Sequence, residues 1–147
     1  MRKIDKIIIH CSATKEGVNF KKRDIERWHR LRGFPYTGGS YCGYHYVIDL
    51  DGTIEVGKNM EVKGCHCRGH NGESIGICYI GGIGWGNTSK NTLTDAQRQS
   101  LKNLVALLTA TFPQAKVYGH RDFCKTKACP CFEVRDMFPK EICGIVC

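Results

Sequence analysis

Two histidines and one cysteine stand in segments where they could bind a metal ion. His10 ends the isoleucine run KIIIH, and His120 ends the short segment KVYGH. Cys129 follows His120 after a polar stretch that is rich in turn residues. Two imidazoles and a thiolate would fill three of the four tetrahedral positions around Zn²⁺ and leave the fourth for a reactive water. These residues therefore predict a catalytic zinc site and indicate a hydrolase.

The segments that carry these residues are predicted to form one central mixed β-sheet. Residues 4–10 and 74–82 are continuous apolar runs of the kind found in buried strands, and residues 116–120 form a short strand. Between them, residues 44–57 hold two strand-like segments around an Asp-Gly pair, which is a strong hairpin signal. Because His10 and His120 each end a strand, we expect them at the sheet edge where ligand sites form in α/β proteins.

Helical periodicity and capping signals predict three flanking helices, over residues 21–32, 95–111 and 133–137. The first would bury a face made of Ile25, Trp28 and Leu31. The second begins with a capping box, in which Thr94 and Gln97 satisfy each other's backbone N–H groups. Strands mixed with helices in this way indicate the α/β class.

Composition favours a single domain that is attracted to anions. The chain has 147 residues, of which 41% are hydrophobic, and it contains no repeat, Pro-rich linker or apolar run of membrane-spanning length. Its net charge of +8 suits nucleic acid, an anionic membrane surface or a bacterial wall polymer. We expect residues 1–147 to form one domain. The N-terminal segment lacks the apolar core and cleavage site of a signal peptide, so we expect a cytoplasmic protein until it is released.

The chain contains ten cysteines, which is an unusual number for its length. They would form disulfides in a secreted protein and stay reduced inside a cell, and the sequence leaves both states open. Cys124 and Cys131 lie close to Cys129 and could compete with it for zinc or be oxidised with it. A second cluster comprises Cys65, His66, Cys67 and His70. It lacks the paired CxxC spacing of structural zinc modules, so no second metal site is predicted.

Several segments, taken in order along the chain, resemble one enzyme family. They are KIIIHCSAT, GYHYVIDLDGTIEVGK, the run from GCHCRGHN into SIGICYIGG, and GHRDFCKTKACP. Together they are similar to zinc-dependent N-acetylmuramoyl-L-alanine amidases of the type 2 group, which includes bacteriophage amidase lysozymes and peptidoglycan recognition proteins. The resemblance extends from about Ile4 to Phe132 and therefore covers nearly the whole chain.

The resemblance implies a role for five residues. The family's zinc ligands fall on His10, His120 and Cys129, its catalytic tyrosine falls on Tyr44, and its active-site lysine falls on Lys127. Members hydrolyse the amide that joins the lactyl group of N-acetylmuramic acid to L-alanine of the stem peptide. A fixed ammonium group would stabilise the developing oxyanion, and the tyrosine would orient the water or exchange a proton with it.

Other polar residues near these motifs are expected to support the site or the fold without binding the metal. His66 lies in the part of the sequence that resembles the substrate cleft, and we expect it to contact substrate or the reactive water. His45 would face the opposite side of its strand from its neighbour and play a structural role. His29 is assigned to packing or to the surface. Arg121 and Asp122 would either support the metal ligands or form a surface ion pair.

The implied protein is a lytic enzyme of a phage or prophage, a bacterial autolysin or an interbacterial effector, with peptidoglycan as its substrate. A non-catalytic recognition domain would share the fold, but the loss of the cysteine ligand expected of that branch is not seen, because Cys129 is present. A small zinc module that binds nucleic acid would show CxxC pairs or finger-like spacing, so no nucleic-acid partner is expected. A second role in binding a regulatory protein stays open.

Overall fold

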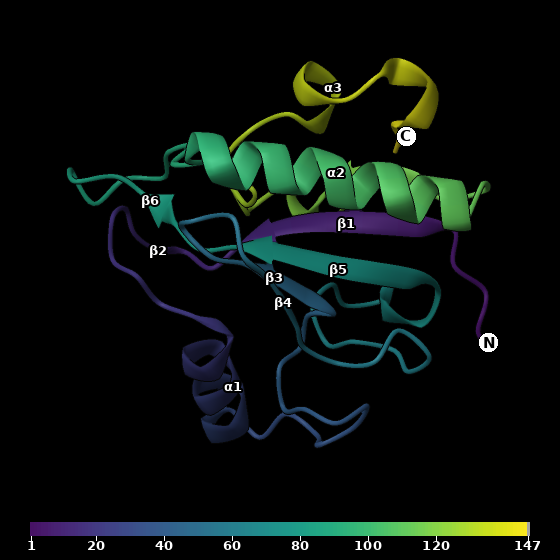
Figure 1. Ribbon diagram of the computed structural model, residues 1–147, viewed down its shortest axis with the longest axis horizontal. Helices are drawn as coiled ribbons and strands as arrows, with labels where there is room; N and C mark the ends of the chain where they lie inside the picture. The colour runs from purple at the N-terminus through teal and green to yellow at the C-terminus, as the bar shows by residue number, and fades with distance from the viewer. Residues whose placement is uncertain (147) are drawn as a thin grey trace.

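The computed structural model describes residues 1–146, and a five-stranded sheet lies at their centre (Figure 1). In spatial order the strands are β4 (Ile54–Val56), β3 (Tyr46–Ile48), β5 (Ser74–Tyr79), β1 (Lys6–Cys11) and β7 (Lys116–Gly119). The β3–β4 pair is antiparallel, and the other neighbours are parallel. The predicted mixed sheet and its hairpin are therefore confirmed.

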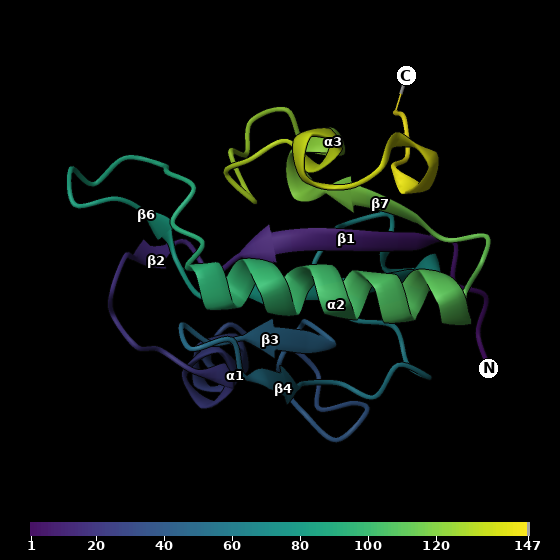
Figure 2. The same cartoon turned by 45° about the horizontal axis from the view of Figure 1, so that its top comes forward.

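Helices cover both faces of this sheet. The long helix α2 (Asp95–Thr111) and the short helix α3 (Val134–Met137) pack on one face, and α1 (Lys22–Leu31) lies on the other (Figures 1 and 2). The short strands β2 (Thr14–Lys15) and β6 (Gly82–Ile83) form a separate two-stranded sheet. Three turns of 3₁₀-helix complete the described elements, at Asn71–Glu73, His120–Asp122 and Lys140–Ile142.

The alternation of side chains along β1 decides which face of the sheet holds the core and which holds the polar site. Ile7 and Ile9 are fully buried in the apolar layer beneath α2, where they join Leu101 and Leu108. Successive side chains of a strand point to opposite faces, so His10 points away from this layer and toward the side of α1. The face beneath α2 therefore holds the larger apolar cluster, and His10 lies on the opposite face, where a smaller apolar cluster forms around Ile25 and Val47.

The first turn of α2 has the predicted capping box. The Thr94 hydroxyl oxygen accepts the N–H of Gln97 at 3.0 Å, and the Gln97 side-chain oxygen accepts the N–H of Thr94 at 3.0 Å. The Gln97 amide also donates to the carbonyl oxygen of Ile80 at 2.9 Å. This third contact joins the start of α2 to the segment that follows β5.

Helix α1 buries a different set of residues from the one predicted. Ile25 is 2% exposed and Trp28 is half-buried, as expected, but Leu31 is 80% exposed and the expectation for it was wrong. His29 is 6% exposed, and its Nδ1 accepts the N–H of Gly43 at 2.8 Å. Each residue turns a helix by about 100°, so positions 25, 28 and 29 face the sheet while position 31 lies outside that arc.

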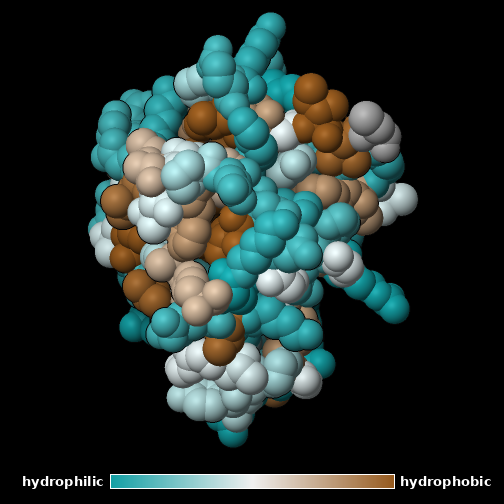
Figure 3. All heavy atoms as spheres, turned by 90° about the vertical axis from the view of Figure 1, so that its right-hand side faces the viewer, coloured by the Kyte–Doolittle hydropathy of each residue, from teal (hydrophilic) through white to brown (hydrophobic). Residues whose placement is uncertain are grey.

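The structure also bears on two expectations from the sequence, the lack of a membrane-spanning segment and the state of the cysteines. No helix among residues 1–146 is long and apolar enough to cross a membrane. On the side of the molecule shown in Figure 3, hydrophilic side chains predominate and hydrophobic ones lie among them in small groups. The nine cysteines within residues 1–146 are free thiols, and Cys147 lies outside the described residues.

We expect the folded state to lose stability as the pH falls from about 6.5 to about 4. Burial lowers the pKa of His29 and of His45 to about 4. An unfolded chain, whose histidines titrate near about 6.5, therefore binds protons in this window that the folded state does not bind. These histidines contribute their full share to the free energy of unfolding above about pH 6.5, and this share is lost as the pH falls toward about 4.

Chemical denaturation at several pH values, compared with a His29→Gln variant, checks this expectation. The acid-induced loss of stability should be smaller in the variant, by at most about 3 kcal/mol, because one titrating ring is gone. Burial raises the pKa of Asp49, which acts in the opposite direction but equally in both proteins. The same loss in both proteins would contradict the role given to His29.

Candidate active site

The register of two adjacent strands brings His10 and His120 together. Strands β1 and β7 are parallel, and Ile9 pairs with Gly119. The residues that follow this pair are the two histidines, and their ring centroids lie 4.6 Å apart. Two residues that are 110 positions apart in the sequence therefore meet at the carboxyl end of β7.

Cys129 reaches the histidines from the loop that follows β7, and three hydrogen bonds fix this loop. The backbone N–H of Arg121 donates to the carbonyl oxygen of Cys129 at 2.7 Å. The backbone N–H of Cys11 lies 3.1 Å from the Cys129 sulfur. The buried Tyr79 hydroxyl donates to the carbonyl oxygen of Pro130 at 2.6 Å. These contacts hold the thiol beside the end of β1.

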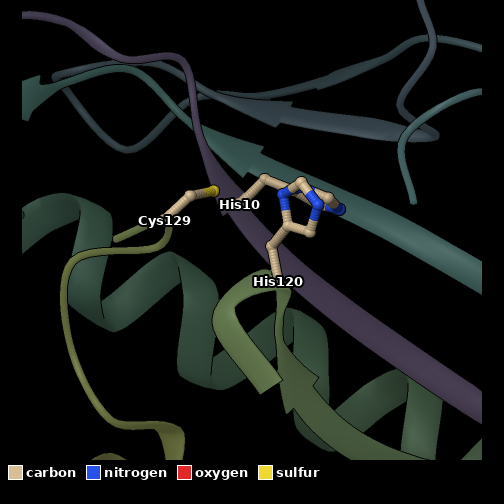
Figure 4. A group of neighbouring side chains, drawn as sticks. All are labelled: His10, His120 and Cys129. Atoms are coloured by element: carbon tan, nitrogen blue, oxygen red, sulfur yellow. The ribbon is translucent and has the colours of Figure 1, made fainter. Parts of the chain in front are cut away.

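The side chains of His10, His120 and Cys129 converge (Figure 4). One potential ligand atom from each lies within 4.8 Å of the other two, and within residues 1–146 this is the one group of its kind. Two imidazole nitrogens and a sulfur are a donor set that suits Zn²⁺. His10 is buried while the other two residues are half-buried, so the cluster is accessible from one side. The segment 65–70 does not form a second group.

The two thiols that were expected to compete with Cys129 lie outside this group. The Cys124 sulfur is 3.4 Å from the Thr126 hydroxyl oxygen. The Cys131 sulfur is 3.8 Å from the Cys11 sulfur and 3.4 Å from the carbonyl oxygen of Gly82. Cys129 is thus the cysteine that the fold places beside the histidines.

His66 packs behind His10 and also lines the pocket. Its Nδ1 lies 2.9 Å from His10 Nε2, and its Nε2 lies 3.2 Å from the Ser74 hydroxyl oxygen. The ring rests on Gly76, where a Cβ would come within 2.7 Å of it. Since the contact with His66 engages Nε2 of His10, Nδ1 is the ring nitrogen that remains for a metal.

A cavity of about 510 Å³ opens over the three residues, and Tyr44 and Lys127 contribute to its lining. The ring centroid of Tyr44 lies 5.1 Å from that of His10. Burial raises the pKa of Tyr44 well above its ordinary value. At neutral pH the phenol therefore keeps its proton, so it can donate a hydrogen bond but is a poor proton acceptor.

The histidines of the site are neutral at ordinary pH. Burial, followed by the nearby His66 and His120, lowers the pKa of His10 well below its usual value. Burial and the positive charge of Lys127 lower the pKa of His120. Neutral imidazole is the form that binds a metal ion, so the site is prepared to accept one.

Three polar residues named in the sequence analysis support the backbone around the site. His45 is fully buried and donates from Nε2 to the carbonyl oxygen of Val62 at 2.9 Å. Arg121 donates to the carbonyl oxygen of Ala128 from Nε at 3.0 Å and from Nη2 at 2.7 Å. The Asp122 carboxylate accepts the last N–H of β7 at 2.9 Å. All three hold the backbone and do not contact the ligand side chains. Arg121 and Asp122 also form ion pairs, with Glu133 at 3.2 Å and with Arg135 at 3.6 Å.

Two further supporting residues were missed from the sequence. The Asn71 side-chain oxygen accepts the N–H groups of His66 and Cys67, each at 2.9 Å. Lys58 is 1% exposed and fixes the loop between α1 and β3. Its ammonium group donates to the carbonyl oxygens of Pro35, Thr37 and Ser40. Asn71 and Lys58 lie outside the main helices and strands, where no periodic pattern marks an isolated polar residue, so only the tertiary structure reveals these roles.

Comparisons with known proteins show the family to which the chain belongs. Residues 1–132 match the family described as N-acetylmuramoyl-L-alanine amidase. The endolysin of Escherichia phage T7 is 38% identical over 136 residues, which cover 92% of this chain and 86% of that protein.

Two solved structures share the fold. The N-acetylmuramoyl-L-alanine amidase LysC from Clostridium intestinale URNW has a TM-score of 0.78 at 24% identity, covering 97% of this chain and 88% of that one. Drosophila PGRP-LB has a TM-score of 0.70 at 27% identity, covering 88% of this chain and 76% of that one. The family match and the endolysin similarity establish that this chain belongs to the type 2 N-acetylmuramoyl-L-alanine amidase family.

Proposed function

We propose that this protein is a zinc-dependent amidase of peptidoglycan that acts in cell-wall lysis. It would hydrolyse the amide between the lactyl group of N-acetylmuramic acid and L-alanine of the stem peptide. Family membership and similarity to a phage endolysin support the reaction. The observation that carries the metal assignment is the convergence of His10, His120 and Cys129 within 4.8 Å. Residues 1–147 would act as one amidase domain.

The metal ligands would be supported by the contacts described above. When bound, zinc supplies Lewis-acid activation of a water and of a carbonyl group. The N–H of Cys11 donates toward the Cys129 sulfur and would stabilise its thiolate form. The contacts from His66 to His10 and Ser74 would orient the His10 ring.

Lys127 and Tyr44 would act on the substrate from the pocket wall. The Lys127 ammonium group is exposed in the pocket and would stabilise the negative charge that develops on the lactyl carbonyl oxygen. The protonated Tyr44 hydroxyl would orient the attacking water by donating a hydrogen bond. Peptidoglycan would be the physiological substrate, reached after the enzyme is released to the wall.

We expect Tyr44→Phe to lower kcat by about a hundredfold while zinc stays bound. Phenylalanine keeps the ring that packs beside His10 and removes only the hydroxyl group. Tyr41→Phe is a matched control, since that ring lies outside the pocket lining and packs on Tyr36. Zinc content and turnover of both variants check the expectation. Full turnover in Tyr44→Phe would show that the hydroxyl group has no catalytic role.

Removal and return of the metal tests the proposed function. A chelator should abolish the release of new amino groups from purified peptidoglycan, because amide cleavage frees the amino group of L-alanine. Stoichiometric zinc should restore this release. Undiminished hydrolysis by protein shown to be free of metal would refute the zinc mechanism.

A further inference from the structure

Helix α1 carries three arginines on the side that faces away from the sheet. Arg23, Arg27 and Arg30 are all exposed, and we call them the arginine face. Each residue turns a helix by about 100°, so these positions fall within an arc of about 60°, opposite the buried Ile25. Helices α2 and α3 pack on the other side of the sheet (Figures 1 and 2), so they do not cover this face.

The arginine face has no internal partner for its charge. In the part of the chain that the structure describes, its guanidinium groups form no ion pair or hydrogen bond, whereas those of Arg121 and Arg135 form both. The two acidic residues of the helix are engaged elsewhere. Asp24 accepts a backbone N–H at the start of the helix, and Glu26 accepts a hydroxyl and an N–H from the following loop. Like charges at three- and four-residue spacing repel each other, so an external anion would stabilise this face.

Two exposed side chains with large apolar parts lie beside the arginine face. Leu31 directly follows Arg30 and is 80% exposed, and Tyr36 is 62% exposed. Arg30 lies over the Tyr41 ring, 5.4 Å from its centroid, and the Tyr41 and Tyr36 centroids are 5.0 Å apart. Leucine and tyrosine beside basic residues are typical of surfaces that contact the interfacial region of a lipid bilayer. A hydrophilic polyanion would offer Leu31 no apolar environment.

We propose that the arginine face, together with Leu31 and Tyr36, binds the surface of an anionic phospholipid bilayer. The guanidinium groups would bind lipid phosphates, and Leu31 and Tyr36 would enter the headgroup region. The same helix and the loop after it contribute His29 and Phe34 to the pocket lining, so a bound protein would hold its active site beside the bilayer. This inference goes beyond the proposed function and requires neither zinc nor peptidoglycan.

Sedimentation with lipid vesicles tests this surface. One set of vesicles contains equal parts of phosphatidylglycerol and phosphatidylcholine, and the other contains phosphatidylcholine alone. The parent protein should bind the anionic vesicles far more strongly, and added salt should weaken this binding. Arg23→Gln, Arg27→Gln and Arg30→Gln should each lower the partition coefficient by about fivefold, and the triple variant should lower it by about a hundredfold. Equal binding of the parent to both sets of vesicles would overturn the proposal.

Leu31→Ser distinguishes a bilayer from a soluble polyanion. It keeps every charge, and it changes a side chain that the fold leaves exposed. We expect it to lower the partition coefficient for anionic vesicles by about tenfold and to leave the binding of long-chain inorganic polyphosphate unchanged. If Leu31→Ser bound vesicles as the parent does, and the arginine variants lost polyphosphate and vesicles alike, the partner would be a polyanion and the bilayer proposal would be wrong.

The triple variant Lys102→Gln, Lys125→Gln, Lys140→Gln is the matched control. It removes the same net charge from exposed positions in α2, in the loop after β7 and in the C-terminal segment. It should bind anionic vesicles within about twofold of the parent, because exposed charges far from the bilayer are screened. Equal losses in the two triple variants would show that net charge alone drives binding, which would overturn the role of α1.

Discussion

Cys129→Ser should lose both its bound zinc and its hydrolytic activity, with kcat/KM falling on the order of a thousandfold or more. The substitution replaces a thiolate donor with a hydroxyl group, which does not ionise near neutral pH. His10 and His120 would then be left as two neutral ligands, and two imidazoles hold zinc far more weakly than the complete set. Two measurements check this expectation: the zinc content per protein molecule and the rate at which the variant hydrolyses purified peptidoglycan.

Cys131→Ser is the matched control for this experiment. It removes a thiol two positions away in the same loop, and the Cys131 sulfur faces Cys11 and Gly82 instead of the histidines. We expect it to keep both zinc and activity. If Cys131→Ser lost the metal while Cys129→Ser kept it, the ligand assignment would be wrong and the loop would have to fold differently around the ion.

Lys127→Ala should keep its zinc and lose turnover by about a hundredfold to a thousandfold. Lys127 is not among the converging donor atoms, so its removal leaves the three ligands in place. It does line the pocket, and its charge lowers the pKa of His120, which places that charge close to the reacting groups. The loss should appear mainly in kcat, since the developing oxyanion exists only in the transition state.

Lys125→Ala supplies the comparison for Lys127→Ala. Lys125 is exposed in the same loop and lies outside the pocket lining, so its variant removes an equal charge without reaching the site. We expect nearly parental turnover from it. Equal losses in the two variants would indicate that the general positive charge of the loop matters, and the specific oxyanion role of Lys127 would fail.

The sequence predicted the main elements because their signals are local. The apolar runs before His10 and in residues 74–79 form buried strands, and the Asp-Gly pair lies in the turn between β3 and β4. The capping box at Thr94 marks the start of α2. Each of these signals depends on a few neighbouring residues, whose preferences the fold does not override.

Local signals could not predict features that depend on residues far apart in the sequence. Periodicity places His10 and His120 near strand ends, but only the adjacency of β1 and β7 and the pairing of Ile9 with Gly119 bring them together. Three-residue spacing also predicted a buried Leu31, whereas the sheet meets the helix on the side of His29. Residue types and positions suggested His10, His120 and Cys129 as ligands, but the preference for Cys129 over its neighbouring thiols depended on family resemblance, because spacing alone did not distinguish them.

Mass spectrometry of purified peptidoglycan digested by this protein, with and without a chelator, shows which bond is cleaved and whether cleavage needs a metal. We expect free stem peptides that begin with L-alanine, together with glycan strands whose muramic acid retains its lactyl carboxylate. These products should vanish under chelation and return with zinc. Intact muropeptides from folded, zinc-loaded protein, or products cleaved at a glycosidic bond or within the peptide, would contradict the proposed amidase function.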